Sequence, residues 1–215
     1  MKKVLLGVLS VFMLGACTSE PTQTQTPQPT QESIDFGATQ HESSISFSID
    51  STSGTDLSVY EPDFSEYYFM NESASYIKGV TFKEALKVFG SDFTGLIFYG
   101  YPQCNFCNEA LPVVTELSNA NQQTVYYVNV HMENYGPDKE DLSKFEEIAY
   151  PWYQDDGEGG KSFFVPTLFA VVEGEIKDAH TGLLPGTTID TSKPLSIEHH
   201  DELASHYTRL FDLVK

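Results

Sequence analysis

The sequence predicts an α/β protein with a central mixed β-sheet flanked by helices and an extension at its amino terminus. Two runs of strand length, 94–100 and 124–130, are almost continuously apolar or aromatic, as buried strands in α/β sheets are. Between them, apolar residues recur every three or four positions over 107–117, which is the period of a helix. A third apolar run, 168–172, followed by Glu173-Gly174 and residues 175–177, predicts a hairpin.

The first 16 residues have the pattern of an export signal. Lys2 and Lys3 precede an apolar segment over 4–16. Thirteen residues of helix span about 20 Å, less than the roughly 30 Å hydrocarbon core, so no permanent membrane span is predicted. Leu14-Gly15-Ala16-Cys17 resembles the lipobox of bacterial lipoproteins, which implies that Cys17 is lipidated after cleavage. The alternative is an ordinary secretory signal with a spare cysteine.

Residues 17–45 are predicted to be the lipidated cysteine and a disordered tether, because 18–33 is rich in Thr, Gln and Pro and has nothing apolar to bury. Residues 46–73 alternate weakly and then carry five aromatic side chains. We expect them to pack on the main domain as a strand and an irregular arm, with a partner-binding surface as the alternative. The main domain is predicted over 74–215.

Local signals place the remaining elements. A short strand at 76–80 leads into a helix that starts at the capping-box spacing of Thr81 and Glu84, runs to Phe89 and ends at Gly90. Pro112 should kink the helix that follows the second strand. Other elements are predicted over the following ranges: a helix at 139–149, a glycine-containing loop at 154–161, and a final helix at 196–214.

Cys104-Asn105-Phe106-Cys107 lies at the start of the helix that follows strand 94–100. Two thiols three residues apart on a helix share one face and can close into a disulfide and reopen. The apolar spacing turns Cys107 toward the core and leaves Cys104 at the exposed helix start, where unpaired N–H groups and the helix dipole favour a thiolate. The predicted chemistry is thiol–disulfide exchange, with Cys104 as nucleophile and Cys107 as the resolving thiol.

Two alternatives use the same cysteines. One is an inert structural disulfide. The other is a metal site completed by two of the histidines at 131, 180, 199 and 200, but none has the spacing of a paired zinc site, and exported thiols tend to oxidise. We therefore expect no metal and no other cofactor.

Acidic residues dominate the chain, with 31 Asp and Glu against 12 Lys and Arg. Removal of the signal with Lys2 and Lys3 takes the formal charge from −19 to about −21. Such a surface disfavours nucleic acid and direct adhesion to anionic lipid. No nucleic-acid partner is expected, and membrane attachment should come from lipid on Cys17.

The order of these elements resembles the thioredoxin fold over residues 74–215. A strand runs directly into Cys-x-x-Cys, and Pro112 falls five residues after Cys107. Val165-Pro166-Thr167 precedes a strand and turn similar to that family's cis-proline loop and terminal hairpin, with Thr181-Gly182 closing the last strand. The stretch Phe98-Tyr99-Gly100-Tyr101-Pro102-Gln103 before Cys104 is similar to bacteriocin transport accessory proteins, thioredoxin-like proteins of Gram-positive bacteria.

The resemblance implies that Pro166 is cis and acts with the two cysteines, and that Tyr101, Val165 and Thr167 line the approach of a substrate chain. The function it implies is a thiol–disulfide oxidoreductase tethered to the extracytoplasmic face of a cell membrane, in a Gram-positive organism. Its partners would be thiols or disulfides of exported proteins or peptides, and a membrane or extracytoplasmic redox partner. A non-redox accessory lipoprotein that binds an exporter or a secreted peptide is the alternative.

Several positions depart from the thioredoxin pattern. Gln103 replaces the tryptophan before the first cysteine, and Phe98 replaces the buried acid, so a proton relay through that acid is absent. Asn105-Phe106 is neither the Gly-Pro of thioredoxins nor the Pro-His of the oxidase DsbA. The segment between Val130 and Val165 is longer than in a minimal thioredoxin. The redox direction therefore does not follow from the resemblance.

Overall fold

The structure is a computed structural model that describes residues 45–215. Its main sheet contains β1 (Ser48–Asp50), β2 (Leu57–Tyr60), β3 (Ile77–Val80), β4 (Gly95–Gly100), β5 (Val125–Asn129), β8 (Thr167–Val172) and β9 (Glu175–Thr181). The helices are α1 (Phe82–Leu86), α2 (Asn105–Asn121), α3 (Lys139–Ala149), the 3-10 turn η1 (Tyr150–Trp152) and α4 (Ile197–Leu213). The predicted signal peptide, Cys17 and the predicted tether up to residue 44 lie outside the described residues. No helix within residues 45–215 is long and apolar enough to cross a membrane.

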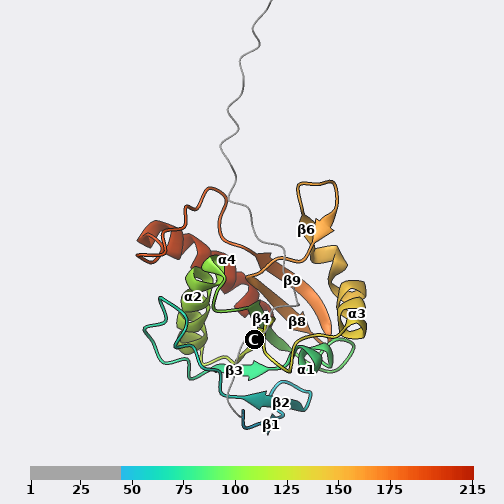
Figure 1. Cartoon of the computed structure of the whole chain (residues 1–215). Coiled ribbons are helices and arrows are strands. Elements are labelled where there is room, and N and C mark those ends of the chain that lie inside the picture. The colour runs from blue at the N-terminus through green and yellow to red at the C-terminus, as the bar shows by residue number, and fades with distance from the viewer. Residues whose placement is uncertain (1–44) are drawn as a thin grey trace, which may run out of the picture.

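The strands follow the order β1-β2-β3-β5-β4-β8-β9 across the sheet (Figure 1). β3 and β4 both run parallel to β5, and every other neighbouring pair in this sheet is antiparallel. Figure 1 shows α2 with α4 on one side of the sheet and α1 with α3 on the other, and each of these helix pairs is in contact. The predicted α/β class, a mixed sheet flanked by helices, is confirmed.

β4 and β5 form the middle of the core. Every residue of both strands is buried, since helices cover both faces of the sheet at this point. This double burial explains why the two segments read as continuous apolar runs rather than alternating ones. Because the two strands are parallel, their carboxyl ends meet at one edge, where Gly100 pairs with Asn129.

Three predicted elements differ from the structure. α1 ends at Leu86 rather than Phe89, because the N–H groups of Lys87 and Val88 bond to carbonyls three residues back and tighten the chain into a turn. The predicted loop at 154–161 contains a small hairpin of β6 (Gln154–Asp155) and β7 (Lys161–Ser162). β9 continues past the 175–177 that the residue pattern predicts to Thr181, where the family resemblance closes the last strand, since it pairs with the whole length of β8.

Other local predictions match the structure closely. α3 has the predicted bounds, and Asp138 and Asp141 form a capping box at its start. Glu173 and Gly174 have φ values of 50° and 76°, the left-handed pair that a tight hairpin turn between β8 and β9 requires. Ser196 caps α4, and its hydroxyl accepts a hydrogen bond from the His199 N–H at 3.3 Å.

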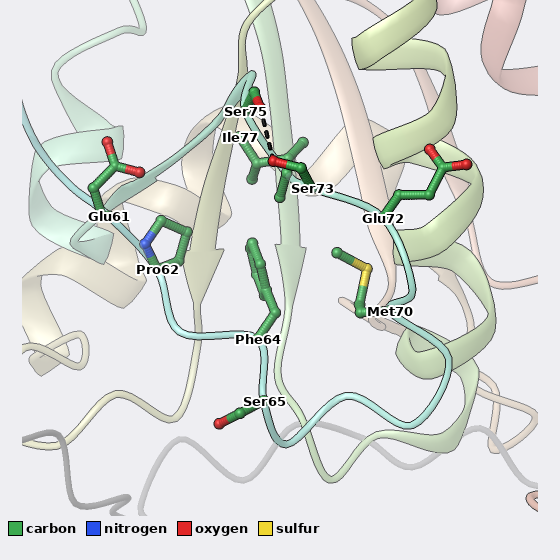
Figure 2. Close-up of a pocket in the computed structure, with 10 residues that line it drawn as sticks. Glu61, Pro62, Phe64, Ser65, Met70, Glu72, Ser73, Ser75 and Ile77 are labelled. Atoms are coloured by element: carbon green, nitrogen blue, oxygen red, sulfur yellow. Dashed lines mark hydrogen bonds between the residues drawn. The ribbon is translucent and has the colours of Figure 1, made fainter.

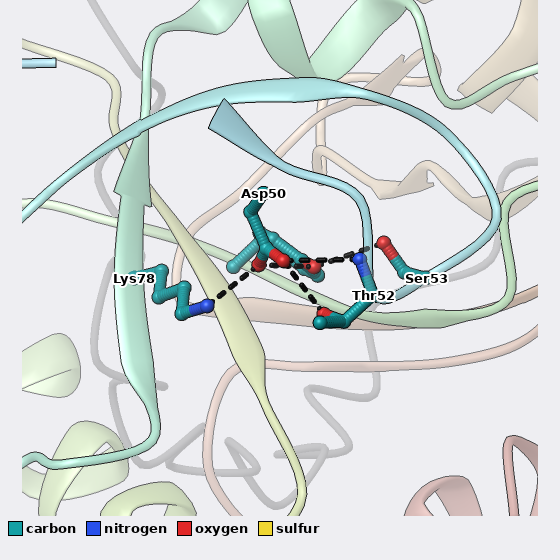
Figure 3. Close-up of polar contacts among 5 residues, drawn as sticks. Asp50, Thr52, Ser53 and Lys78 are labelled. Atoms are coloured by element: carbon teal, nitrogen blue, oxygen red, sulfur yellow. Dashed lines mark hydrogen bonds and ion pairs between the residues drawn. The ribbon is translucent and has the colours of Figure 1, made fainter. Parts of the chain in front are cut away.

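β1 and β2 extend the sheet beyond β3, and a buried carboxylate holds them there. Asp50 accepts hydrogen bonds from the Lys78 ammonium at 2.8 Å, the Tyr126 hydroxyl at 2.9 Å, and the Thr52 N–H and hydroxyl at 3.0 and 2.7 Å (Figure 3). Burial opposes ionisation of Asp50, but these donors outweigh it and lower the pKa of the carboxyl to about 2. The start of the described chain is thereby joined to β3 and β5.

Candidate redox-active site

The Cys-x-x-Cys motif lies at the edge where β4 and β5 end. β4 stops at Gly100, a short turn follows, and Cys104 is the residue that caps the amino terminus of α2. Cys104 and Cys107 form a disulfide, with their Cα atoms 5.1 Å apart. The backbone N–H of Cys107 donates a hydrogen bond to Cys104 Sγ at 3.0 Å. The first sulfur therefore receives one of the free N–H groups at the helix start, an environment that favours a thiolate when the bond is reduced.

Cys104 is less accessible than predicted. Its exposed fraction is 7% and that of Cys107 is 0%, so Cys104 is the outer sulfur, but the expectation of an exposed position is wrong. The reason lies in another part of the chain, because the carbonyl oxygen of Val165 lies 3.8 Å from Cys104 Sγ. A disulfide sulfur has no proton to donate, so this approach is a packing contact in the oxidised protein.

Gly100 makes room for the inner sulfur. A Cβ atom at this position would lie 3.3 Å from Cys107 Sγ and 2.7 Å from the ring of Phe98. Phe98, which stands where thioredoxins have a buried acid, is itself fully buried. The inner face of the disulfide is thus closely packed against strand β4, with an aromatic ring in place of an ionisable group.

The Val165–Pro166 peptide bond is cis, the geometry that the family resemblance implied. The Pro166 carbonyl accepts a hydrogen bond from the Gly182 N–H at 2.8 Å, which joins this loop to the end of β9. Thr167 is 1% exposed, and its hydroxyl donates to the Phe164 carbonyl at 2.7 Å and contacts the Thr181 hydroxyl at 2.8 Å. The Thr167 side chain is therefore engaged within the protein, whereas Val165 lies directly beside Cys104.

Tyr101 lies on the same edge of the sheet. Its carbonyl accepts a hydrogen bond from the Cys104 N–H at 3.2 Å, and its half-buried ring stacks on His131 with centroids 4.1 Å apart. Gln103 and Asn105 are exposed on either side of Cys104, and Phe106 is half-buried. The accessible surface around the disulfide therefore consists of polar and aromatic side chains close to the outer sulfur.

Asn108 was not predicted as a site residue, although it directly follows Cys107. Its side chain is 0% exposed and makes three hydrogen bonds. The amide nitrogen donates to the carbonyls of Pro102 at 2.6 Å and Cys104 at 3.0 Å, and the amide oxygen accepts from the Tyr68 N–H at 2.6 Å. Asn108 lies beside the apolar stripe of this helix rather than on it, so no local sequence signal marked its burial.

Glu109, the next residue of α2, is also buried and was also missed. Its carboxylate accepts a hydrogen bond from the Leu195 N–H at 2.9 Å, which holds the connection before α4 against α2. Burial raises the pKa of Glu109, the Leu195 N–H opposes this rise, and Asp190 adds to it. Its bond to a backbone amide gives Glu109 a structural role.

The histidines weighed as metal ligands are dispersed. His180 packs near His206 and Tyr207, and His200 pairs with Glu116 at 2.9 Å, while His131 stacks on Tyr101. Within residues 45–215, no group of three or more His, Cys, Asp and Glu side chains is arranged to hold a metal ion. The redox pair is thus the chemically distinctive group in this part of the chain.

The segment 61–76 between β2 and β3, called the arm from here on, borders a separate open pocket of about 480 Å³. Figure 2 shows Phe64 and Met70 pointing into it, with Glu61 and Glu72 on its two sides. Phe64 also packs on Tyr127 of β5, with centroids 5.2 Å apart. None of the predicted site residues within 45–215 lines this pocket.

Comparison with known proteins identifies no family for this chain. No protein-family model matches the sequence, and no curated protein matches it. Among solved structures, the oxidised crystal structure of thioredoxin O2 from Arabidopsis thaliana is similar, with a TM-score of 0.38 and 18% identity. The match covers 67% of this chain and 100% of that one.

Proposed function

We propose that this protein is a thiol–disulfide oxidoreductase that acts on exported proteins or peptides from the extracytoplasmic face of a membrane. The observation that carries the proposal is the Cys104–Cys107 disulfide at the start of α2, with the cis Val165–Pro166 loop beside its outer sulfur. A pair placed at a helix amino terminus has a more stable thiolate than an ordinary cysteine, and the thiolate is the attacking species.

The reaction transfers two electrons and two protons between two sulfur pairs. In the reducing direction, the Cys104 thiolate attacks one sulfur of a client disulfide, and the other client sulfur leaves as a thiolate that takes up a proton. Cys107, once deprotonated, then attacks Cys104 Sγ, so that the second client sulfur leaves and the Cys104–Cys107 bond forms. The oxidising direction is the same sequence in reverse. No cofactor is needed for either direction.

The surroundings of the pair supply a route for a client chain. Val165 and the partly exposed Tyr101 flank Cys104. Pro166 has no N–H and its carbonyl already accepts the Gly182 N–H, so an extended client chain would pair with the backbone of Val165 instead. Cys104 is 7% exposed and its sequence neighbours Gln103 and Asn105 are exposed, so we infer that the client sulfur reaches Cys104 past these two side chains. Cys107 takes part in the reaction only after Cys104 and the client have formed the mixed disulfide.

The proposed location rests on the first 45 residues. Cys17 would carry the lipid, the Thr-, Gln- and Pro-rich segment would hold the domain away from the bilayer by roughly 30 Å, and the acidic surface would not adhere to anionic lipid. A membrane or extracytoplasmic redox partner would restore the pair after each turnover.

Trapping of the mixed disulfide tests the proposal. Cys107→Ser should accumulate a covalent complex between Cys104 and exported clients, released by dithiothreitol, because the resolving thiol is gone. Cys104→Ser is the matched control and should trap nothing and lose activity. If the two variants behave alike, or if Cys104→Ser retains the full cellular role, the protein acts as a non-redox binding module instead.

The reduction potential assigns the direction. A value near −120 mV would exclude a reductase and one near −270 mV would exclude an oxidase, since these are the potentials of a strong oxidant and of thioredoxin. Equilibration with glutathione at several ratios, with the two redox forms separated after thiol alkylation, gives this value.

A further inference from the structure

We infer that Asn108 is a positioning residue that fixes the orientation of Cys104 and makes the arm between β2 and β3 part of the redox site. The inference deepens the exchange reaction proposed above and concerns the same cysteine pair. It rests on the three hydrogen bonds of a fully buried amide, none of which belongs to the α-helix ladder.

Asn108 holds the turn that carries Cys104. The Asn108 amide donates to carbonyls on both sides of Gln103, those of Pro102 and Cys104. These two bonds tie the last three residues of the turn to the first full turn of α2. The Cys104 carbonyl also accepts the Asn108 backbone N–H at 3.0 Å, so removal of the amide takes the donor mainly from the Pro102 carbonyl. The amide is 0% exposed, so water does not easily replace it there.

Asn108 also binds the arm between β2 and β3. Asn108 Oδ1 accepts the Tyr68 N–H at 2.6 Å, and Gln103 Nε2 donates to Glu66 Oε2 at 3.0 Å. Two residues of the arm therefore form hydrogen bonds with side chains that precede and follow Cys104 in the sequence. Asn108 is the residue common to both sets of contacts, because a single side chain holds the turn with its nitrogen and the arm with its oxygen.

These bonds bear on the redox equilibrium. Cys104 Sγ lies 3.0 Å from the Cys107 nitrogen, and in the reduced protein the same N–H stabilises a Cys104 thiolate. This stabilisation depends on the turn keeping Cys104 over the helix start. Loss of the Asn108 amide should therefore disfavour the reduced form, lower the thiolate fraction of Cys104 at neutral pH and make the pair harder to reduce.

Asn119 provides a matched control within the same helix and the same arm. Its amide nitrogen donates to the Ser73 carbonyl at 2.7 Å, so it also ties α2 to the arm, but it lies near the far end of α2 from Cys104. Substitution of Asn119 removes an arm contact of the same chemistry without touching the redox turn. Comparison of the Asn108 and Asn119 variants therefore distinguishes a general weakening of the contact between the arm and α2 from a specific loss of Cys104 positioning.

The test measures the equilibrium of the Cys104–Cys107 pair with glutathione in Asn108→Ala, Asn119→Ala and the unmodified protein. Two glutathione thiols reduce the protein disulfide and leave as glutathione disulfide, so atoms and electrons balance. Asn108→Ala should change the equilibrium constant about tenfold toward the disulfide, which is about 30 mV. Asn119→Ala should stay within about twofold of the unmodified protein. Urea unfolding of each variant measures stability separately.

Asn108→Asp keeps an oxygen for the Tyr68 N–H but loses both donors to the turn. It should shift the equilibrium at least as far as alanine does, and it is close in volume to asparagine should the alanine variant fold poorly. If the aspartate variant equilibrates like the unmodified protein, or if all three variants lose stability with no change in equilibrium, Asn108 is a structural residue and the inference is wrong.

Hydrogen exchange in the unmodified protein provides a check without substitution. The Asn108 side-chain amide protons should exchange much more slowly than those of the exposed Asn71. Equal rates would overturn the inference. Failure of the proposed function has a different signature: the glutathione equilibrium would be normal and sensitive to Asn108, but Cys107→Ser would trap no client.

Discussion

Replacement of Asp50 by asparagine should destabilise the protein by about 2 kcal/mol at neutral pH. The pKa of this carboxyl falls from 3.8 to about 2 in the folded protein, and each unit corresponds to about 1.4 kcal/mol. The Asp50 side chain is 3% exposed and Lys78 is 30% exposed, so solvent screens the pair only in part. Asparagine keeps the shape of the side chain but removes the charge and one acceptor.

The pH dependence follows from the direction of the shift. Because the folded-state pKa is lowered, the contribution of Asp50 is complete above about pH 4 and is lost as the pH falls through about 2. Urea unfolding followed by circular dichroism at pH 7 should therefore show the full difference between the two proteins. At pH 2.5 the difference should be less than half as large.

Asp63→Asn is the matched control, because Asp63 lies in the arm and accepts a hydrogen bond from the Ser65 N–H near the surface. Its effect should stay within about 0.5 kcal/mol. A loss below about 0.5 kcal/mol for Asp50→Asn, or a loss that is the same at pH 2.5 and pH 7, would refute the reasoning. Such a small loss for Asp50→Asn would mean that β1 and β2 contribute little to the cooperative unfolding of the domain.

Two further predictions concern the site and the opposite end of the sheet. Gly100→Ala should destabilise the protein by about 1–3 kcal/mol, because the added methyl group presses on Cys107 Sγ and Phe98. The same substitution should raise the rate at which dithiothreitol reduces the disulfide. Unchanged reduction kinetics and stability would contradict the packing described. Burial, with a smaller contribution from His206, lowers the pKa of His180 to about 4. The unfolded chain therefore binds a proton at this histidine more readily than the folded protein does, and stability should fall as the pH drops from about 6.5 to 4. His180→Phe should flatten this part of the curve in melting temperatures measured at pH 7 and pH 4.5, and an unaltered slope would assign the dependence to other groups.

The sequence predicted those elements whose cause is local. β4 and β5 were predicted from continuous apolar runs, and the turn at Glu173-Gly174 from its residue types. The errors lie where the cause is distant. β9 is long because β8 lies beside it, and the hairpin of β6 and β7 forms in a segment with almost no apolar pattern.

The same distinction between local and distant causes applies to the features of the candidate site. The spacing of Cys104 and Cys107 and their place at a helix start were evident in the sequence, because both depend on residues within one turn of each other. Resemblance to a family, rather than the local pattern, suggested the cis bond before Pro166, and the structure has it. The burial of Cys104 and the inward direction of the Thr167 hydroxyl came from segments about 60 and 14 residues away.

The sequence by itself determined the reactive chemistry, since two cysteines on one helical turn can form and break a disulfide wherever the fold places them. Only the tertiary structure decided how that chemistry is controlled. The loop at Val165 covers the outer sulfur, Gly100 admits the inner one, and Asn108 joins the turn to an arm 40 residues earlier in the chain. These contacts depend on packing among segments far apart in sequence, and no local pattern of residues encodes them.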